Sequence, residues 1–326
     1  GSFDANDFGR NAGAEFNYLN KAGSWGGWAQ LHASFKPEKY DKNLYYSAGV
    51  FHLSRNLEVF AAYSKTDENF YTDVGFNARA MNYDAERDTF VRLGYGILYN
   101  STNYTFYPKN NERVTQHGPR FETAPILNDD GSLNDWNLTL DYRVMFNTQG
   151  YVSLGYVRND VRLPFATELV AETPLPVGRY LFNSVRGEYQ SDPRKKFNYN
   201  LNFEYGQFYN GTKTSLGTLL RFRQQPWGNF ALRLSRDYVQ LPDPYGTADL
   251  WLIGPQINVN FNRNIFWTTY LQYNTQWDNF NINSRLQWRF KPMSDLFLVY
   301  TDNYGLETFG LRNRALVLKL NYWLTL

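Results

Sequence analysis

The sequence predicts an all-β protein, a transmembrane antiparallel up-and-down β-barrel of about 16–18 strands that forms a single domain over residues 1–326. Three observations predict it. Apolar and polar residues alternate over long segments, tight turns alternate with longer polar connections, and 18% of the residues are aromatic although the mean hydropathy is −0.57. The aromatic content excludes intrinsic disorder. The sequence has no apolar run of about 18 residues, so a bundle of transmembrane helices is excluded.

The segment 281–291 shows the alternation most clearly. Its first parity consists of Ile282, Ser284, Leu286, Trp288 and Phe290. The other parity consists of Asn281, Asn283, Arg285, Gln287, Arg289 and Lys291. Successive side chains of a strand point to opposite faces, so this segment has one apolar and one polar face. The same pattern recurs in 136–146, 197–205, 256–262 and 315–324.

Amphipathic strands occur in two architectures. In a soluble sandwich or lipocalin-type barrel the apolar side chains point inward to a core, whereas in an outer-membrane barrel they point outward to lipid. The expected strands have about 10–14 residues, compared with about 5–6 in globular proteins and about 9–11 for a tilted span. Aromatic residues such as Trp267, Tyr273 and Tyr322 cluster near the ends of the apolar parity, as in an interfacial girdle. We therefore favour the membrane barrel.

Turn residues divide the chain into strands. The expected strands are 12–21, 24–37, 44–54, 57–67, 89–100, 103–122, 134–147, 150–160, 179–191, 197–208, 213–225, 230–240, 250–262, 265–276, 279–291, 295–302 and 313–325. Their number is odd, whereas bacterial single-chain barrels have an even number of strands. Either one strand is missed or split, or a further strand lies before residue 12, where Ser2 to Phe8 is a candidate.

Short and long connections alternate along most of the chain. The expected short turns are 55–56, 100–103, 147–150, 193–196, 226–229, 263–264 and 292–295, all with Asn, Gly, Pro or Asp. In a membrane barrel the short turns face the periplasm and the long loops face outward. On this pattern, Glu68 to Arg87 forms a long extracellular loop or an extension above the bilayer.

Several segments resemble one protein family. They are Thr269 to Phe290, Lys291 to Asn303, Arg312 to Leu320, Asp73 to Arg79 and Phe208 to Thr212. They are similar to the large outer-membrane barrels of unknown function that follow an N-terminal carbohydrate-binding-like domain of family 9. The resemblance implies that this chain corresponds to the barrel part, with or without its first strands. It offers no catalytic residues to carry over.

The polar parity supplies the candidate site. Its charged residues are expected to line the lumen: Arg92, Arg143, Arg221, Arg223, Arg233, Arg285, Arg289, Lys291, Lys319, Glu58, Asp141 and Glu204. Charged rings set the selectivity of a pore, so one hypothesis is a passive channel for small polar solutes such as saccharides. The alternative is a structural barrel that displays a binding domain or joins an envelope complex, with these charges paired across a blocked lumen. Polar residues and Tyr270 either bind glycans or simply line the wall.

Other functions find little support. The chain has no Cys, and its three His residues are far apart, so we expect no metal site and no cofactor. His32 is a formal candidate base, but nothing nearby completes a triad, and we do not expect an enzyme. Asn128 to Gly131 does not match a calcium loop.

The remaining expectations concern partners and location. A net charge of +2 gives no basis for nucleic-acid binding. A barrel of this kind belongs in the outer membrane of a Gram-negative bacterium, among lipid and lipopolysaccharide. Glycans and other envelope proteins are further candidate partners. No signal peptide opens the sequence, so we expect a mature or truncated chain.

Overall fold

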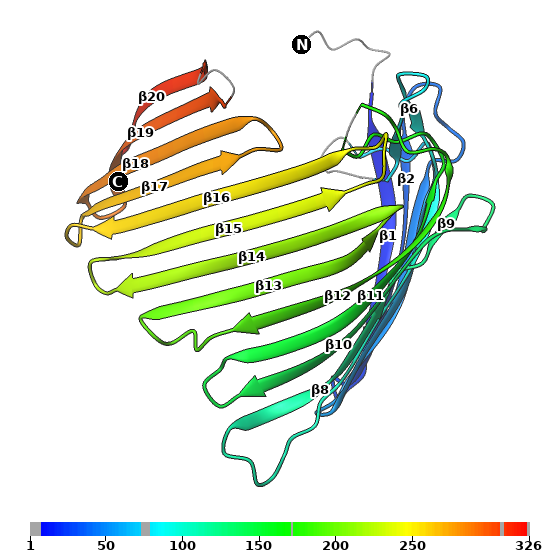
Figure 1. The fold of residues 1–326 in the computed structure, drawn as a ribbon, viewed down its shortest axis with the longest axis horizontal. Coiled ribbons are helices and arrows are strands. Elements are labelled where there is room, and N and C mark those ends of the chain that lie inside the picture. Colours follow the sequence, from blue (N-terminus) through cyan, green and yellow to red (C-terminus); the bar gives the residue numbers. More distant parts are fainter. Residues whose placement is uncertain (1–7, 73–78, 171, 307–309, 325–326) are drawn as a thin grey trace.

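The computed structural model describes residues 8–72, 79–170, 172–306 and 310–324, and these ranges contain strands and no helix (Figure 1). They form an 18-stranded sheet and a separate two-stranded sheet, which confirms the predicted all-β class and strand number. No described segment is a helix of the length and apolarity that a membrane span requires. The strands are β1 (Arg10–Leu19), β2 (Trp25–Phe35), β3 (Leu44–Leu53), β4 (Leu57–Thr66), β5 (Met81–Asp84), β6 (Thr89–Arg92), β7 (Tyr95–Tyr104), β8 (Val114–Thr123), β9 (Ile126–Asn128), β10 (Leu133–Phe146), β11 (Tyr151–Leu163), β12 (Gly178–Gln190), β13 (Phe197–Phe208), β14 (Gly211–Gln224), β15 (Gly228–Gln240), β16 (Thr247–Asn260), β17 (Ile265–Asn274), β18 (Asn279–Lys291), β19 (Ser294–Gly305) and β20 (Leu311–Asn321).

The large sheet has the predicted up-and-down order, because each strand pairs antiparallel with the next one around the sheet. Two places depart from strict succession. The β5–β6 hairpin forms its own sheet, so β4 pairs directly with β7. Strands β8 and β9 both lie between β7 and β10 and act as one strand interrupted at Ala124 and Pro125. Counted in this way, the described sheet has 17 strand positions.

Two expected strands were placed wrongly. The segment 89–100 is not one strand, because β6 ends at Arg92 and belongs to the small sheet, and β7 begins at Tyr95. The segment 103–122 is likewise divided, because β7 continues through the expected turn at 100–103 and the connection to β8 spans 105–113. Part of the expected loop 68–87 forms β5, while its residues 73–78, like most of the candidate strand Ser2 to Phe8, lie outside the described residues.

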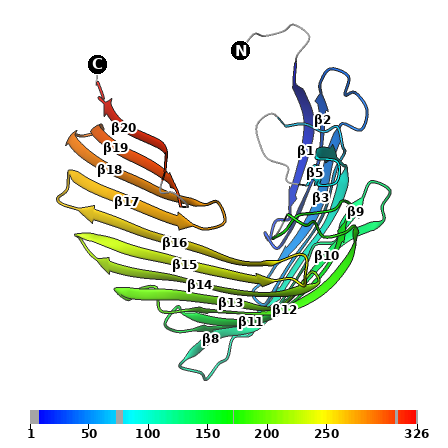
Figure 2. The same ribbon diagram turned by 45° about the horizontal axis from the view of Figure 1, so that its top comes forward.

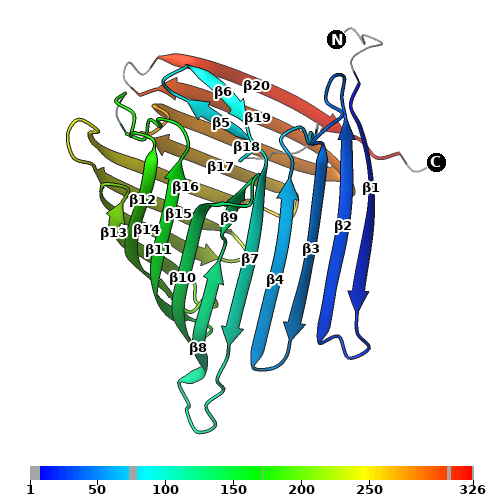
Figure 3. The same cartoon turned by 90° about the vertical axis from the view of Figure 1, so that its right-hand side faces the viewer.

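The connections separate by length between the two ends of the sheet (Figure 3). One end carries tight connections such as 54–56, 147–150 and 261–264. The opposite end carries most of the longer ones, including 67–94 with the β5–β6 hairpin and 164–177. The separation has exceptions, because the long 105–113 lies at the first end and the short 209–210 at the second. We call the first end the turn end and the second the loop end. The predicted alternation of short and long connections is confirmed in its general form.

The sheet curls, and its edge strands β1 and β20 lie on opposite sides of the curl (Figures 1 and 2). Among the described residues, β1 pairs only with β2, and β20 pairs only with β19. Strand β1 leads into the turn 20–24, and β20 starts from the loop end after Gly310. Both edge strands therefore run toward the turn end, that is, in the same sense relative to the sheet.

The two faces of the sheet differ in chemistry. The apolar face exposes large side chains, including Leu216 with 53% and Leu318 with 68% of its surface exposed. The opposite, polar face carries small residues that are almost inaccessible, such as Ser184 with 7% exposed. Side chains converge on the inside of a curled sheet, so this burial places the polar face inside the curl.

Buried apolar residues gather at the loop end. Leu163, Leu175, Phe182, Val239 and Leu241 are all buried there, on or next to β11, β12, β15 and the connection 164–177. The β5–β6 hairpin joins them, because the Ala85 amide donates to the Ala166 carbonyl. The described part of the molecule therefore packs apolar side chains mainly where its loops fold over the sheet.

Candidate functional site on the polar face

Cross-strand register shows which predicted charges share the polar face. Directly paired residues of adjacent strands lie on the same face, so the pairs can be followed around the sheet. By this test the polar face carries Glu58, Asp141, Arg143, Glu204, Arg221, Arg223, Arg233, Arg285, Arg289 and Lys319. The candidate site is therefore an extended wall rather than a compact cluster.

Two predicted residues have other positions. Arg92 ends β6 of the small sheet, where its guanidinium donates to the backbone carbonyls of Glu68 and Phe70 and lies 4.0 Å from the centre of the Tyr71 ring. It braces the 67–94 connection and is not part of the wall. Lys291 follows a register shift at the end of β18, and its Nζ is 3.3 Å from the Tyr322 hydroxyl.

An ion pair spans three strands of the wall. Arg186 on β12 donates through Nε to Asp141 Oδ1 at 2.9 Å, and its second nitrogen bonds Oδ2. The residue between them on β11 is Gly155, which pairs with both. A Cβ at Gly155 would lie 1.9 Å from the Asp141 carboxylate. Because Gly155 has no Cβ, the Asp141 carboxylate and the Arg186 guanidinium can meet above it.

Other carboxylates on the wall accept hydrogen bonds from neutral groups. Glu188 accepts from the Tyr151 hydroxyl at 2.6 Å and from the Asn200 amide at 2.9 Å. Glu204 accepts from the Ser184 hydroxyl at 2.6 Å. These partners hold the side chains in place without neutralising their charge.

A small cavity of about 190 Å³ opens on the wall near the turn end. Its lining includes Glu58, Asn103, Arg120 and Arg143 from β4, β7, β8 and β10. The Arg143 guanidinium lies 4.6 Å from the centre of the Tyr151 ring. The buried Asn103 Oδ1 and Arg120 Nε have no hydrogen-bond partner among the described residues. Donor, acceptor and charge therefore converge on a space that admits a small polar molecule.

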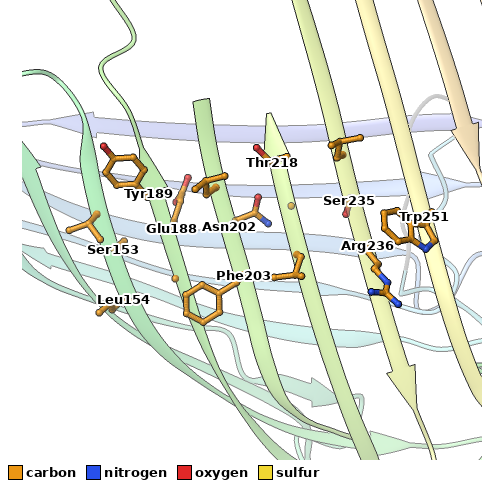
Figure 4. A pocket seen from close by; sticks show the side chains of 16 residues that line it. Ser153, Leu154, Glu188, Tyr189, Asn202, Phe203, Thr218, Ser235, Arg236 and Trp251 are labelled. Atoms are coloured by element: carbon orange, nitrogen blue, oxygen red, sulfur yellow. The ribbon is translucent and has the colours of Figure 1, made fainter. Parts of the chain in front are cut away.

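A larger hollow, of about 590 Å³, lies on the other side of the sheet (Figure 4). Leu154, Tyr189, Phe203 and Trp251 line it, and polar residues of β11 to β16 such as Glu188, Asn202 and Arg236 border it as well. It opens on the face that exposes the apolar side chains, away from the ion pairs of the wall. Most of its surface is apolar, so we assign it to the apolar face and not to the candidate site.

Some candidate residues discussed from the sequence have structural partners. His32 Nε2 lies 3.4 Å from a Glu15 carboxylate oxygen on the neighbouring strand. Asp129, in the segment compared with a calcium loop, forms an ion pair with Lys65. Tyr270 is on the polar face, with its hydroxyl next to Gly254.

Several charged residues of the wall were missed by the sequence analysis. They are Glu15, Arg120, Glu122, Asp135, Arg186, Glu188, Lys213, Asp237 and Asp295. Arg120 and Glu122 were missed because the 103–122 strand was given the wrong bounds. Arg186 and Glu188 alternate with Val185 and Tyr189, so the period-two pattern of 179–191 contained the signal.

Comparisons with known proteins add only a broad likeness of shape. No protein-family model matches the sequence, and no curated protein matches it. A point mutant of the ferric enterobactin receptor PfeA from Pseudomonas aeruginosa is 8% identical, with a TM-score of 0.43 over 91% of this chain and 65% of that chain. The siderophore receptor PirA from Acinetobacter baumannii is 9% identical, with a TM-score of 0.41 over 93% of this chain and 66% of that chain. This chain thus spans about two thirds of each receptor chain.

Proposed function

We propose that the large sheet is the wall of an outer-membrane β-barrel in a Gram-negative bacterium, and that its polar face lines a passage for small polar solutes such as saccharides. The observation that carries the proposal is the division of the two faces. Exposed Leu, Phe, Tyr and Trp side chains predominate on one face, which also carries ion pairs such as Arg236–Asp249. Ion pairs and amides lie on the other face. A soluble curled sheet would instead bury its apolar face.

The lengths of the strands support a membrane span. Strands β10 to β16 have 12 to 14 residues each, and about 9–11 residues suffice to cross the hydrocarbon core at a tilt. The outward residues then meet lipid without a desolvation cost. The inward Asn, Gln, Ser and Tyr side chains offer donors and acceptors to hydroxylated solutes, and barrels of about 16–18 strands can enclose an aqueous channel.

Conductance of the purified full-length protein in a planar bilayer tests the proposal. We expect stepwise openings, and swelling of protein-containing liposomes in an isotonic monosaccharide solution. Heat-modifiable migration on gels supplies the folding control. Well-folded protein that neither conducts nor swells liposomes would overturn the passage and favour the structural anchor as the function.

A further inference from the structure

Positive and negative charges on the polar face are segregated by strand. On β1 to β13 carboxylates outnumber cations: Glu15, Glu58, Glu122, Asp135, Asp141, Glu188 and Glu204 against Arg120, Arg143 and Arg186. On β14 to β20 cations outnumber carboxylates: Lys213, Arg221, Arg223, Arg233, Arg285, Arg289 and Lys319 against Asp237 and Asp295. We call these two regions the acidic side and the basic side.

Local ion pairs leave an excess of negative charge on the acidic side. Arg186 is engaged by Asp141, and Arg120 lies 3.4 Å from Glu122. Asp135 is paired with Arg79 of the 67–94 connection at 2.7 Å. Glu188 and Glu204 are held only by hydroxyl and amide donors, and Glu58 is 3.4 Å from the Asn103 amide nitrogen. These three carboxylates therefore have no cationic partner among the described residues, and they face the inside of the curl.

The basic side has the opposite excess. Lys213 and Arg289 are paired, at 3.6 Å from Asp237 and 3.1 Å from Asp295. Arg221, Arg233, Arg285 and Lys319 form no ion pair with any residue in the part of the chain that the structure describes. Arg223 donates to the backbone carbonyls of Pro193 and Lys195, which leaves its charge unneutralised.

The curl places the outer strands of the two sides opposite each other, with Glu15 and Glu58 on one and Arg285, Arg289 and Lys319 on the other. Glu188 and Glu204, on β12 and β13, lie beside the basic side instead, because β13 pairs with β14. Strands β1 to β4 face β17 to β20 across the inside of the sheet (Figure 2). Fixed charges of opposite sign on facing walls create an electric field across the space between them, and low-dielectric surroundings strengthen it. An ion of either sign is attracted by one wall and repelled by the other. A solute with both charges can turn so that each end meets its opposite.

We propose that the passage selects zwitterionic solutes, such as amino acids and short peptides, over ions of one sign. This inference rests on the proposed function, because it needs a passage lined by the polar face. It narrows the class of solute from small polar molecules in general to molecules with separated charges.

Charge-neutralising variants of the full-length protein test this selectivity. The basic-side variant combines Arg221→Gln, Arg233→Gln and Arg285→Gln, and the acidic-side variant combines Glu58→Gln, Glu188→Gln and Glu204→Gln. The control is Arg236→Gln, which removes a guanidinium from the apolar face near Trp251. Reversal potentials in a KCl gradient give the K⁺/Cl⁻ permeability ratio. Liposome swelling compares alanine, a zwitterion, with neutral glycerol of similar size.

We expect the parent to show a permeability ratio near one and faster swelling in alanine than in glycerol. The basic-side variant should raise the ratio about fivefold and the acidic-side variant should lower it about fivefold, the Boltzmann effect of one unit charge at about 4 Å in water. Both should lose the preference for alanine, and the control should keep it. Conducting, folded variants with unchanged ratios, or a parent with no preference for alanine, would overturn the inference alone. A folded but silent parent would overturn the proposed function with it.

Discussion

Asp141 on β10 and Arg186 on β12 form a bidentate ion pair across an intervening strand, and Gly155 of that strand is what allows them to meet. A methyl group at this position would overlap the carboxylate, since the nearest oxygen is 1.9 Å from the ideal Cβ position. The pair links three strands in the middle of the sheet.

Gly155→Ala should therefore lower the free energy of unfolding by about 1–3 kcal/mol, the usual cost of overpacking. Urea-induced unfolding of the protein in lipid vesicles measures it. The matched control is Gly178→Ala, where the added Cβ would meet nothing closer than 3.7 Å. Equal stability of the two variants would show that the ion pair moves aside without cost.

The lipid contact of the apolar face can be tested with neighbouring residues of one strand. Leu201 on β13 is exposed on the apolar face, and Asn202 is on the polar face opposite Gly217. Leu201→Arg should destabilise the protein in vesicles by about 2–4 kcal/mol if the residue lies near the bilayer midplane. Asn202→Arg should cost much less, because its side chain points inside toward Glu188 and Glu204. Equal effects of the two variants in vesicle unfolding would argue against a lipid-facing apolar side.

Period-two alternation was sufficient to predict most of the sheet. In 279–291 the expected bounds coincide with β18, and the expected segments 134–147 and 197–208 match β10 and β13 within one residue. The charges assigned to the wall from these segments, such as Asp141, Glu204 and Arg285, lie on it. Alternation works here because one face of the curled sheet is exposed and apolar and the other is polar, so the two parities of each strand separate.

The pattern failed where tertiary contacts decide. Residues 89–92 were joined to 95–100 as one expected strand, but they pair with β5, and Arg92 binds carbonyls of the same long connection. The Asp141–Arg186 pair is equally invisible in the sequence, because it depends on the register of three strands. The local sequence pattern predicts which face of the sheet a side chain occupies. Its neighbours on adjacent strands depend on the strand register, which the local pattern does not contain.

Acid should weaken the turn between β12 and β13. Arg194 donates through Nε and Nη2 to the Asp192 carboxylate at 3.0 Å, and its backbone amide donates at 2.9 Å. The Arg194 guanidinium, with this amide, holds the pKa of Asp192 below its usual range. A lowered pKa in the folded state means that the stabilisation is complete above the unfolded-state pKa and disappears as the pH falls through the folded-state pKa.

Asp192→Asn should therefore reduce stability at pH 7 and leave it nearly unchanged at a pH below the folded-state pKa of Asp192. Urea unfolding in vesicles at several pH values measures the difference. Glu172→Gln, in the exposed part of the connection 164–177, is the control. If Asp192→Asn lowers stability by the same amount at every pH, the charge of Asp192 does not stabilise the turn, and the variant acts through packing or hydrogen-bond geometry.

Strands β1 and β20 run in the same direction, so joining them directly would create a parallel pair in a sheet that is otherwise antiparallel. To close the sheet with antiparallel pairs only, an odd number of additional strands must lie between β1 and β20. A second copy of the chain in the same orientation cannot supply an antiparallel neighbour, because its edge strands run in the same direction. The chain has no Cys, which permits disulfide mapping of the seam. Ala14→Cys combined with Leu316→Cys, Leu318→Cys or Leu320→Cys in the membrane-inserted full-length protein should give no disulfide on oxidation.

The positive control is Ala14→Cys with Leu31→Cys, because these two residues are paired across β1 and β2. Efficient cross-linking of β1 to β20 within one chain would show that the edges close on each other in parallel, because disulfides form only when the Cα atoms are within about 7 Å.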